Sequence, residues 1–179
     1  MTLRATAGGL VARNLRSECE VRAAFPLEEA GYSEDEAASR ASMLYRFREA
    51  PHLFLGAFAE DGSIVGYIMS TQAAAPLVTH ASMSTHDPAG STVCIHSVCV
   101  SPAWQRKGVA SMLLREYTTS MRNYNSRLAA TGSAPRLARL AMLSREHLLP
   151  LYERAGYTTL GRSSVVHGAE SWYDCILDL

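Results

Sequence analysis

A short polar turn, Gln-Arg-Lys-Gly-Val-Ala at residues 105–110, has the composition of an anion-binding loop. The stretch before it, Thr92–Val100, is apolar and β-branched at nearly every position, which predicts a strand buried on both faces. Apolar residues at helical spacing follow the turn. Because the first N–H groups of a helix have no partner within the helix, they point toward whatever lies before it. The sequence therefore predicts a cradle for a phosphate or a similar anion.

His96, inside the apolar stretch, is suited to proton transfer. An unperturbed imidazole has a pKa of about 6.5, so it can accept a proton at neutral pH, directly or through water. Tyr152 is suited to the opposite task, because a phenol with a pKa of about 10 is mostly protonated at neutral pH and can donate. Both positions have a structural alternative. His96 would then be a hydrogen-bonded core histidine, and Tyr152 a packed helix aromatic.

A zinc site is a further alternative, because Cys94 and His96 have the spacing of two ligands on one strand face and His86 precedes them. A structural zinc needs four ligands, and no fourth ligand is evident. We therefore expect no metal. The chain has four cysteines without paired metal-ligand spacing, interpreted as buried free thiols in a reducing compartment: Cys19, Cys94, Cys99 and Cys175.

The length and charge of the chain limit the classes of protein it can be. Its 179 residues suffice for one domain with a sizeable core, and we expect residues 1–179 to form a single domain. The 17 basic and 17 acidic residues balance, so no electrostatic footprint for nucleic acid appears. No apolar run approaches the length of a membrane span. We expect a cytoplasmic monomer or weak dimer with no nucleic-acid or membrane partner.

Periodicity and turn residues predict the order βααββ, loop, βα, βα, ββ, which is a mixed α/β sheet. Ser33 followed by Glu36 is typical of a helix start, and Asp61-Gly62 is typical of a hairpin. A doubly wound dinucleotide fold is disfavoured because its Gly-x-Gly-x-x-Gly turn is absent. The predicted elements, in chain order, are strand 3–9, helix 10–25, helix 33–48, strands 52–59 and 63–71, a loop at 73–91, strand 92–100, a helix from residue 110, an exposed insertion at 123–135, strand 136–143, helix 146–155, and strands 157–160 and 171–179.

The turn at residues 105–110 resembles the acetyl-CoA pyrophosphate loop of the GNAT N-acetyltransferases, whose pattern is Gln/Arg-x-x-Gly-x-Gly/Ala after a buried strand. Three further segments resemble the serotonin (arylalkylamine) N-acetyltransferases within that superfamily, and more closely their non-vertebrate branch. Leu148–Tyr157 is similar to a proline- and tyrosine-bearing segment that ends in Gly-aromatic. Ile95–Val100 is similar to the central strand, and Ala24–Leu27 to the proline-bearing substrate loop.

The resemblance implies the GNAT acyl-CoA N-acyltransferase fold and a role for each matching residue. His96 would take part in proton removal and Tyr152 would protonate the coenzyme sulfur, whereas the first histidine of the family's alternating pair falls on Cys94. The implied substrate-lining residues are Phe25, Pro26, Cys94 and Leu143. The implied acetyl-CoA-binding residues, which would pair with the pantetheine arm or hold the pyrophosphate, are Val98, Cys99, Val100, Gln105, Arg106, Lys107, Gly108, Val109, Ala110 and Ser111.

The activity expected from this resemblance is acetyl-CoA-dependent N-acetylation, with direct transfer of the acetyl group to a small primary amine. An arylalkylamine such as serotonin, tryptamine or phenylethylamine is the first choice, and a polyamine the next. The alternatives are a GNAT enzyme that acts on a protein or peptide, and a non-catalytic acyl-CoA-binding module. A minor variant of the mechanism would use Cys94 as an acylated nucleophile.

Overall fold

The computed structural model describes residues 9–131, 136–168 and 171–179. The chain divides into two compact units. Unit 1 comprises Met1–Ser70 and Ser97–Glu116, and unit 2 comprises Thr71–His96 and Tyr117–Leu179. Three elements have residues in both units: strand β3 (Ile64–Ala73), strand β4 (Thr92–Val100) and helix α4 (Val109–Thr131).

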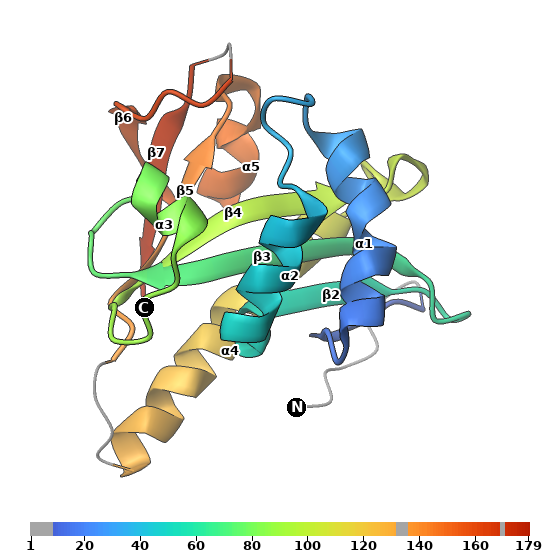
Figure 1. The fold of residues 1–179 in the computed structure, drawn as a ribbon, viewed down its shortest axis with the longest axis horizontal. Coiled ribbons are helices and arrows are strands. Elements are labelled where there is room, and N and C mark those ends of the chain that lie inside the picture. The colour runs from blue at the N-terminus through green and yellow to red at the C-terminus, as the bar shows by residue number, and fades with distance from the viewer. Residues whose placement is uncertain (1–8, 132–135, 169–170) are drawn as a thin grey trace. The chain divides into compact units, whose positions relative to one another are not determined.

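Unit 1 contains β1 (Val11–Asn14), α1 (Glu18–Gly31), α2 (Arg40–Glu49) and β2 (Phe54–Phe58), together with most of β3. The strand β2 pairs antiparallel with both β1 and β3. Helices α1 and α2 lie side by side against these strands (Figure 1). The buried side chains between them form one hydrophobic cluster: Leu15, Val21, Ala24, Phe25, Met43, Phe47, Phe54, Phe58, Tyr67, Met69 and Cys99.

The first predicted helix begins later in the chain than the sequence pattern predicts. The helix expected at residues 10–25 is α1, which begins at Glu18 after the N-cap Ser17 and continues through Pro26 to Gly31. The apolar residues from position 11 form β1 instead. A proline inside a helix removes one backbone hydrogen bond, but Pro26 is exposed and the helix does not end there. The strand predicted at residues 3–9 lies, apart from residue 9, outside the described residues.

The second helix also begins later than predicted. The N–H groups of Glu36 and Ala37 both donate to the carbonyl of Ser33 at 2.9 Å, so the predicted capping box forms a single turn. Helix α2 begins at Arg40, and Ser39 is its N-cap. Between the turn at Ser33 and helix α2, the N–H of Ala38 donates to the side chain of Glu28 at 2.8 Å. This contact separates the turn from the helix.

The predicted hairpin after β2 is confirmed. Asp61 accepts hydrogen bonds at its Oδ1 from the N–H and the hydroxyl of Ser63, and Gly62 has a φ of 82°. A φ in this left-handed region suits glycine because it has no Cβ. The 3-10 turn at Pro51–Leu53 replaces the first residues of the strand predicted at 52–59.

Unit 2 contains the first half of β4, which pairs in parallel with β5 (Arg139–Ser144). The strand β7 (Tyr173–Asp178) pairs antiparallel with β5 and with β6 (Thr158–Arg162). Parallel and antiparallel pairs therefore both occur, which confirms the predicted mixed α/β class. Figure 1 shows the short helix α5 (Leu149–Arg154) beside β5. A 3-10 turn at Glu146–Leu148 precedes α5, and Gly156 follows it with a φ of 95°, as predicted for a helix end.

Two other predictions for unit 2 are wrong in part. The stretch 73–91 is not wholly a loop, because it contains helix α3 (His80–Ser84) with a capping box between Thr79 and Ser82. The predicted insertion at 123–135 is helical through Thr131, where α4 ends. Asn125 gives the polar end of α4 a partner, since its side chain exchanges two hydrogen bonds of 2.7 Å with the backbone of Leu137.

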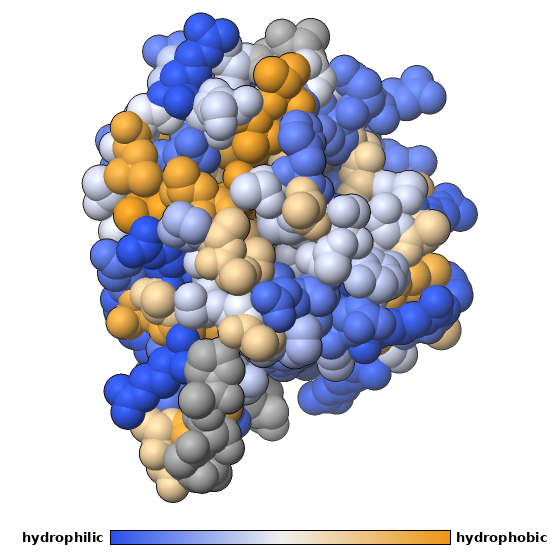
Figure 2. Space-filling view, turned by 60° about the vertical axis from the view of Figure 1, so that its left-hand side comes forward, coloured by the Kyte–Doolittle hydropathy of each residue, from blue (hydrophilic) through white to orange (hydrophobic). Residues whose placement is uncertain are grey.

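The surface of the described chain has few large exposed apolar side chains, namely Tyr45, Leu160 and Val166. On the face in Figure 2, hydrophilic groups lie between the hydrophobic ones. Within the described residues, none of the helices has both the length and the apolar character needed to cross a membrane. All four cysteines are free thiols, and Cys19 is exposed rather than buried as expected.

Candidate functional site

The turn after β4 has the backbone geometry of an anion cradle. A 3-10 turn at Pro102–Trp104 leads into it, and two of its residues, Arg106 at φ 60° and Gly108 at φ 82°, have left-handed backbones just before α4 begins. A left-handed residue among right-handed ones turns successive N–H groups toward one side, which makes a concavity for anions. The side chains of Arg106 and Lys107 are exposed, and the Nζ of Lys107 lies 5.5 Å from the centre of the Trp104 ring.

Gly108 is required here for its backbone conformation rather than for space. A Cβ built on Gly108 meets no atom of the described chain within 4 Å. Its φ of 82° is nevertheless one that other residues adopt at a cost of about 1–2 kcal/mol. The first residues of α4 differ in exposure: Val109 is buried, Ala110 is half-buried and Ser111 is exposed.

The second half of β4 presents backbone groups next to this turn. Val98 and Val100 are half-buried, whereas Cys99 is buried. The Nε2 of Gln105 donates to the carbonyl of Val100 at 3.1 Å, which connects the turn to the end of the strand. A carbonyl oxygen has two lone pairs, so this bond leaves Val100 able to accept a second one.

The side chains of the same half-strand converge on a buried carboxylate, Glu28 of α1. The hydroxyl of Ser97 donates to Glu28 at 3.1 Å, the thiol of Cys99 donates at 3.3 Å, and the hydroxyl of Tyr67 also donates to it. With the N–H of Ala38, four donors surround a side chain that is only 1% exposed. We call these residues the Glu28 cluster.

Charge and burial shape the protonation of this cluster. Arg46 is 7% exposed, and burial lowers the pKa of its guanidinium while the negative charge of Glu28 opposes that shift. Burial also raises the pKa of Tyr67 and of Cys99 well above their ordinary values, and the charge of Glu28 adds to both shifts. Phenol and thiol therefore stay protonated and donate to the carboxylate.

Sequence reasoning missed Glu28, although a signal for it was present. Val21, Ala24, Phe25 and Glu28 occupy one helical stripe, and these are the buried residues of α1. An acidic residue on an apolar stripe must find donors when the helix packs. The sequence pattern predicts that this helix ends before Pro26, so Glu28 was not assigned to the stripe.

The two predicted substrate-lining residues of α1 differ in environment. Phe25 is 9% exposed and belongs to the core cluster of unit 1, where the guanidinium of Arg40 lies 4.6 Å from the centre of its ring. Pro26 is exposed. Their contact with a substrate stays a prediction.

In unit 2, His96 forms a hydrogen bond with a buried threonine. Its Nε2 lies 2.8 Å from the Oγ1 of Thr71, and the same Oγ1 donates to the carbonyl of Ser82 at 2.7 Å. His96 itself is half-buried. The imidazole predicted on this strand is thus held by a hydrogen bond at its Nε2.

A small apolar cluster contains the other two predicted substrate-lining residues. Cys94 and Leu143 pack with Ala73, Val78, Ala141, Met83 and Ile176. Burial raises the pKa of the Cys94 thiol to about 11. At pH 7 a thiol with that pKa is ionised in only about one molecule in ten thousand, so Cys94 is poorly suited to act as a nucleophile.

Tyr152 is buried in α5, and its ring makes an edge contact with Tyr157 at a centroid distance of 6.1 Å. Tyr157 is the more enclosed of the two. Burial raises the pKa of Tyr157 well above that of an ordinary phenol, and the neighbouring Tyr117 and Tyr152 add to the shift. Sequence reasoning did not distinguish these two tyrosines by burial.

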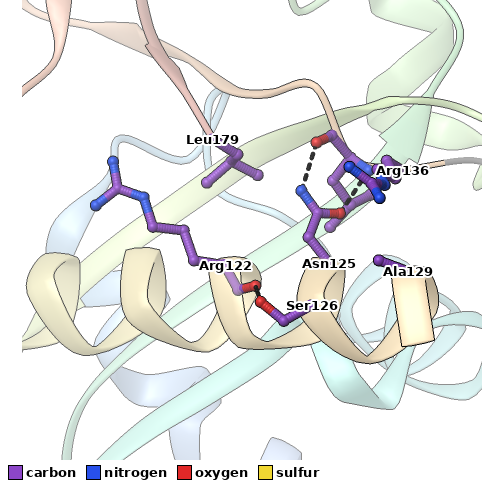
Figure 3. Close-up of a pocket in the computed structure, with 7 residues that line it drawn as sticks. Arg122, Asn125, Ser126, Ala129, Arg136 and Leu179 are labelled. Carbon is purple, nitrogen blue, oxygen red and sulfur yellow. Dashed lines mark hydrogen bonds between the residues drawn. The ribbon is translucent and has the colours of Figure 1, made fainter.

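A separate cavity of about 330 Å³ lies between the second half of α4 and the C-terminal residues. Figure 3 shows the side chain of Arg122 extending away from Arg136, so their guanidinium groups do not converge. The residues that line this cavity include none of the predicted site residues. Elsewhere in the described chain, no three His, Cys, Asp or Glu side chains are grouped as a metal ion would need.

Comparison with known proteins gives a consistent result. Residues 14–157 match the Acetyltransferase (GNAT) family. The chain is 29% identical over 119 residues to the serotonin N-acetyltransferase of Mesocricetus auratus, an alignment that covers 66% of this chain and 52% of that protein. The chain spans about half the length of the curated relatives it matches.

Two solved structures share the fold. The GNAT-like decarboxylase GphF in complex with isobutyryl-CoA has a TM-score of 0.71 and 19% identity, and covers 93% of this chain and 98% of its own. The NatC complex bound to Gag peptide and CoA contains a chain that is similar to this one with a TM-score of 0.72 and 17% identity. The superposition covers 95% of this chain and 98% of that chain. Because the family match extends over most of the chain, this protein belongs to the GNAT acetyltransferase family.

Proposed function

We propose that this chain is an acetyl-CoA-dependent N-acetyltransferase that transfers acetyl directly to a small primary amine, with an arylalkylamine such as tryptamine, serotonin or phenylethylamine as the first choice. The observation that carries the proposal is the His96 imidazole, whose Nε2 is held by Thr71. His96 lies on the same strand as Cys94, which belongs to the apolar cluster. A titratable ring near an apolar cluster suits an acceptor that has an ammonium group on an aromatic body.

The reaction requires one proton to be removed and another to be supplied. An alkylammonium group has a pKa of about 10, so it must lose a proton before its nitrogen can attack. His96 accepts that proton, directly or through water. The amine nitrogen then bonds to the carbonyl carbon of the thioester and loses its second proton, the carbon–sulfur bond breaks, and the departing sulfur takes a proton from Tyr152. The second proton from nitrogen restores the phenol of Tyr152, and His96 releases its proton to solvent. The net products are an N-acetylamine, CoA thiol and a proton.

Acetyl-CoA supplies the acetyl group as an activated thioester. The amides of residues 106–111 fit a diphosphate, because the left-handed backbones of Arg106 and Gly108 turn N–H groups together before α4. Backbone groups of residues 98–100 would pair with the pantetheine arm as an added strand does. The high pKa of Cys94 favours direct transfer over an acyl-enzyme. The reducing cytoplasm is the location we propose, since the chain keeps its four cysteines as free thiols.

An amine panel tests the proposal. The full chain is incubated with acetyl-CoA and tryptamine, phenylethylamine, spermine or a short peptide, and CoA thiol release is measured. Faster turnover on the arylalkylamines supports the proposal. Turnover confined to the peptide makes the chain a peptide acetyltransferase. Heat on CoA titration without turnover on any amine makes it a binding module, and no heat with CoA overturns the proposal as a whole.

Tyr152→Phe tests the role of that phenol. Turnover is expected to fall more than about tenfold while the affinity for acetyl-CoA barely changes, because a general acid contributes to the chemical step rather than to binding. Tyr157→Phe is the matched control: it removes a neighbouring phenol whose burial keeps it from substrates, so turnover per folded molecule should persist. An unaltered rate in Tyr152→Phe would remove Tyr152 from the mechanism.

A further inference from the structure

The apolar cluster around Cys94 follows one face of the sheet, and the strand register shows which residues continue that face. Cys94 of β4 pairs with Ala141 of β5, which pairs with Ile176 of β7, and all three belong to the cluster. Because successive side chains of a strand alternate between the two faces, residues two positions away return to the same face. The next row of this face therefore lies two residues further along each strand.

That next row contains a histidine, a leucine and an aspartate. The register places Leu143 of β5 opposite Asp174 of β7. The parallel register of β4 with β5 ends at Ile95 and Met142, and His96 is the next residue of β4. His96, Leu143 and Asp174 thus follow one another across the sheet where the pairing of β4 with β5 ends. A carboxylate is therefore placed at the same level of the sheet as the proposed base.

The carboxyl of Asp174 has lost water without gaining a cation. Asp174 is half-buried, and its Oδ1 is enclosed by the protein. Burial raises the pKa of this carboxyl above its ordinary value, and a hydrogen bond with Ser163 opposes the shift. None of the ion pairs in the described part of the chain includes Asp174. Because burial disfavours an uncompensated charge, a cation nearby would stabilise the charged form.

The cross-strand neighbours of Asp174 do not neutralise its charge. On β5 the neighbour is the apolar Leu143, and on β6 it is Gly161. Gly161 has no side chain, and a Cβ built at this position meets no atom of the described chain within 4 Å. Space is therefore open beside Asp174 on the side of β6, and its negative charge acts on the apolar cluster next to it.

An arylalkylamine combines the two properties that this face of the sheet can recognise. Its aromatic body suits the apolar cluster, and its ammonium group, with a pKa of about 10, is a cation in water. Coulombic attraction falls only with the inverse of the distance and is stronger beside a protein interior than in water, so it does not require contact with the enclosed Oδ1. Two strand spacings, about 10 Å, separate β4 from β7, so an acceptor near His96 lies within reach of this attraction.

We propose that Asp174 is a specificity-determining residue whose carboxylate attracts the ammonium group of the acceptor, so that the protein selects cationic amines over neutral molecules of the same shape. Its place in catalysis rests on the proposed acetyl transfer, whereas the preference for charge can be measured without any transfer. Asp174 acts on the binding of the acceptor, before the ammonium group loses its proton.

A neutral molecule of matching shape separates charge from shape. Calorimetry at pH 8 with CoA present measures the binding of phenylethylamine and of 2-phenylethanol to the full chain. We expect Asp174→Asn to weaken the binding of phenylethylamine about tenfold and to leave that of 2-phenylethanol unchanged, whereas Asp174→Glu, which keeps the charge, should retain the preference for the amine. Equal losses for both ligands in Asp174→Asn would indicate a structural role and overturn the proposal, and so would unchanged affinities or the absence of binding.

Asp178→Asn is the matched control, because it removes a carboxylate of the same strand that is already paired with Arg139 at 3.3 Å, and it should leave both affinities unaltered. Carbon NMR of the Asp174 carboxyl in the unaltered protein needs no variant to fold. Saturation with phenylethylamine should lower the pKa of this carboxyl, since a nearby cation favours the charged form, and saturation with 2-phenylethanol should not. A pKa that the amine does not lower overturns the proposal.

Turnover separates this inference from the proposed function. If phenylethylamine binds with the expected dependence on Asp174 but is not acetylated, the proposed function fails and the role of Asp174 in selecting cations stands. If phenylethylamine is acetylated with the same KM in Asp174→Asn as in the unaltered protein, the proposed function stands and the role of Asp174 is wrong.

Discussion

Around Glu28 four donors point at one carboxylate, whereas the ring of His96 shares a hydrogen bond with the hydroxyl of Thr71. Both clusters are polar and largely buried, yet their hydrogen bonds leave different capacities. A carboxylate has about four acceptor positions, and those of Glu28 are all used. His96, in contrast, meets Thr71 through one ring nitrogen, Nε2, at 2.8 Å.

This difference separates a structural from a chemical role for buried charge. Glu28 receives hydrogens from α1's own connection to α2, from β3 and from β4, so it joins elements of unit 1. A saturated carboxylate of this kind has nothing left for a substrate ammonium. We therefore expect substitution of Glu28 to lower stability and substitution of His96 to lower turnover. The comparison fails if the Glu28 variant loses mainly turnover and the His96 variant mainly stability.

His96→Gln should have the largest effect on turnover. Glutamine retains a polar group for Thr71 but does not titrate, so we expect kcat/KM on the preferred amine to fall about 100-fold or more. The free energy of unfolding, measured with urea, should change by less than about 1 kcal/mol. His147→Gln, at an exposed position, is the control. If the pH profile of turnover is the same with and without His96, the ring takes no part in proton removal.

Glu28→Gln should show the reverse pattern. The amide offers one acceptor oxygen and brings two hydrogens toward groups that already donate, and it leaves the buried Arg46 without the opposing charge. Leaving a buried donor without its acceptor costs about 1–3 kcal/mol, and because more than one donor is affected we expect a loss of about 3 kcal/mol in the free energy of unfolding. Turnover per folded molecule should stay within about threefold.

The control for this substitution is Glu29→Gln, which neutralises the adjacent but exposed carboxylate. It should leave stability within about 0.5 kcal/mol of the unaltered protein. Equal stability of the Glu28 and Glu29 variants would mean that the four donors contribute nothing net, and the contrast with His96 would then disappear.

The sequence was sufficient to predict the strands whose signal is local. The apolar run 92–100 coincides with β4, and Asp61-Gly62 closes the predicted hairpin. In each case neighbouring residues along the chain carry the information, through backbone preference or through a short pattern.

What the sequence did not reveal depends on contacts between distant residues. Ser33 and Glu36 have the spacing of a helix start, but the bond from Ala38 to Glu28 intervenes and α2 begins later. Thr71 and His96 are separated by 25 positions, and no local pattern marks the threonine as a partner. Polar residues whose role is to orient another side chain have no spacing rule, so they emerge only from the folded structure.

In unit 1 we also expect the turn at residues 105–110 to act on function, by binding CoA. Substitutions of two glycines, Gly108 in this turn and Gly62 in the hairpin, separate that role from backbone strain. Gly108 and Gly62 both have a φ of 82° and both would accommodate a Cβ without a contact inside 4 Å. Alanine should therefore strain each backbone equally, by about 1–2 kcal/mol. Calorimetry with CoA should show about tenfold weaker binding for Gly108→Ala and unchanged binding for Gly62→Ala. Equal affinities would remove the turn at 105–110 from the binding of CoA.

The smallest effect concerns two buried thiols, that of Cys94 in the apolar cluster and that of Cys99 in the Glu28 cluster. Burial raises the pKa of Cys94 from 9 to about 11. The folded protein therefore holds the proton after the unfolded chain has lost it, so the stability that Cys94 contributes is complete below pH 9 and is lost as pH rises toward 11. Between pH 8 and pH 10 this loss amounts to about 1 kcal/mol.

Cys94→Ala should remove that part of the alkaline loss and keep turnover within about threefold, because direct transfer needs no thiol nucleophile. Cys19→Ala, at an exposed thiol, should leave the pH dependence unaltered. In the Glu28 cluster the carboxylate itself adds to the raised pKa of Cys99, so Glu28→Gln should weaken the alkaline dependence there as well. An acetylated Cys94 trapped by mass spectrometry would instead make the apolar cluster that contains Cys94, and not His96 alone, the place where the chemistry occurs.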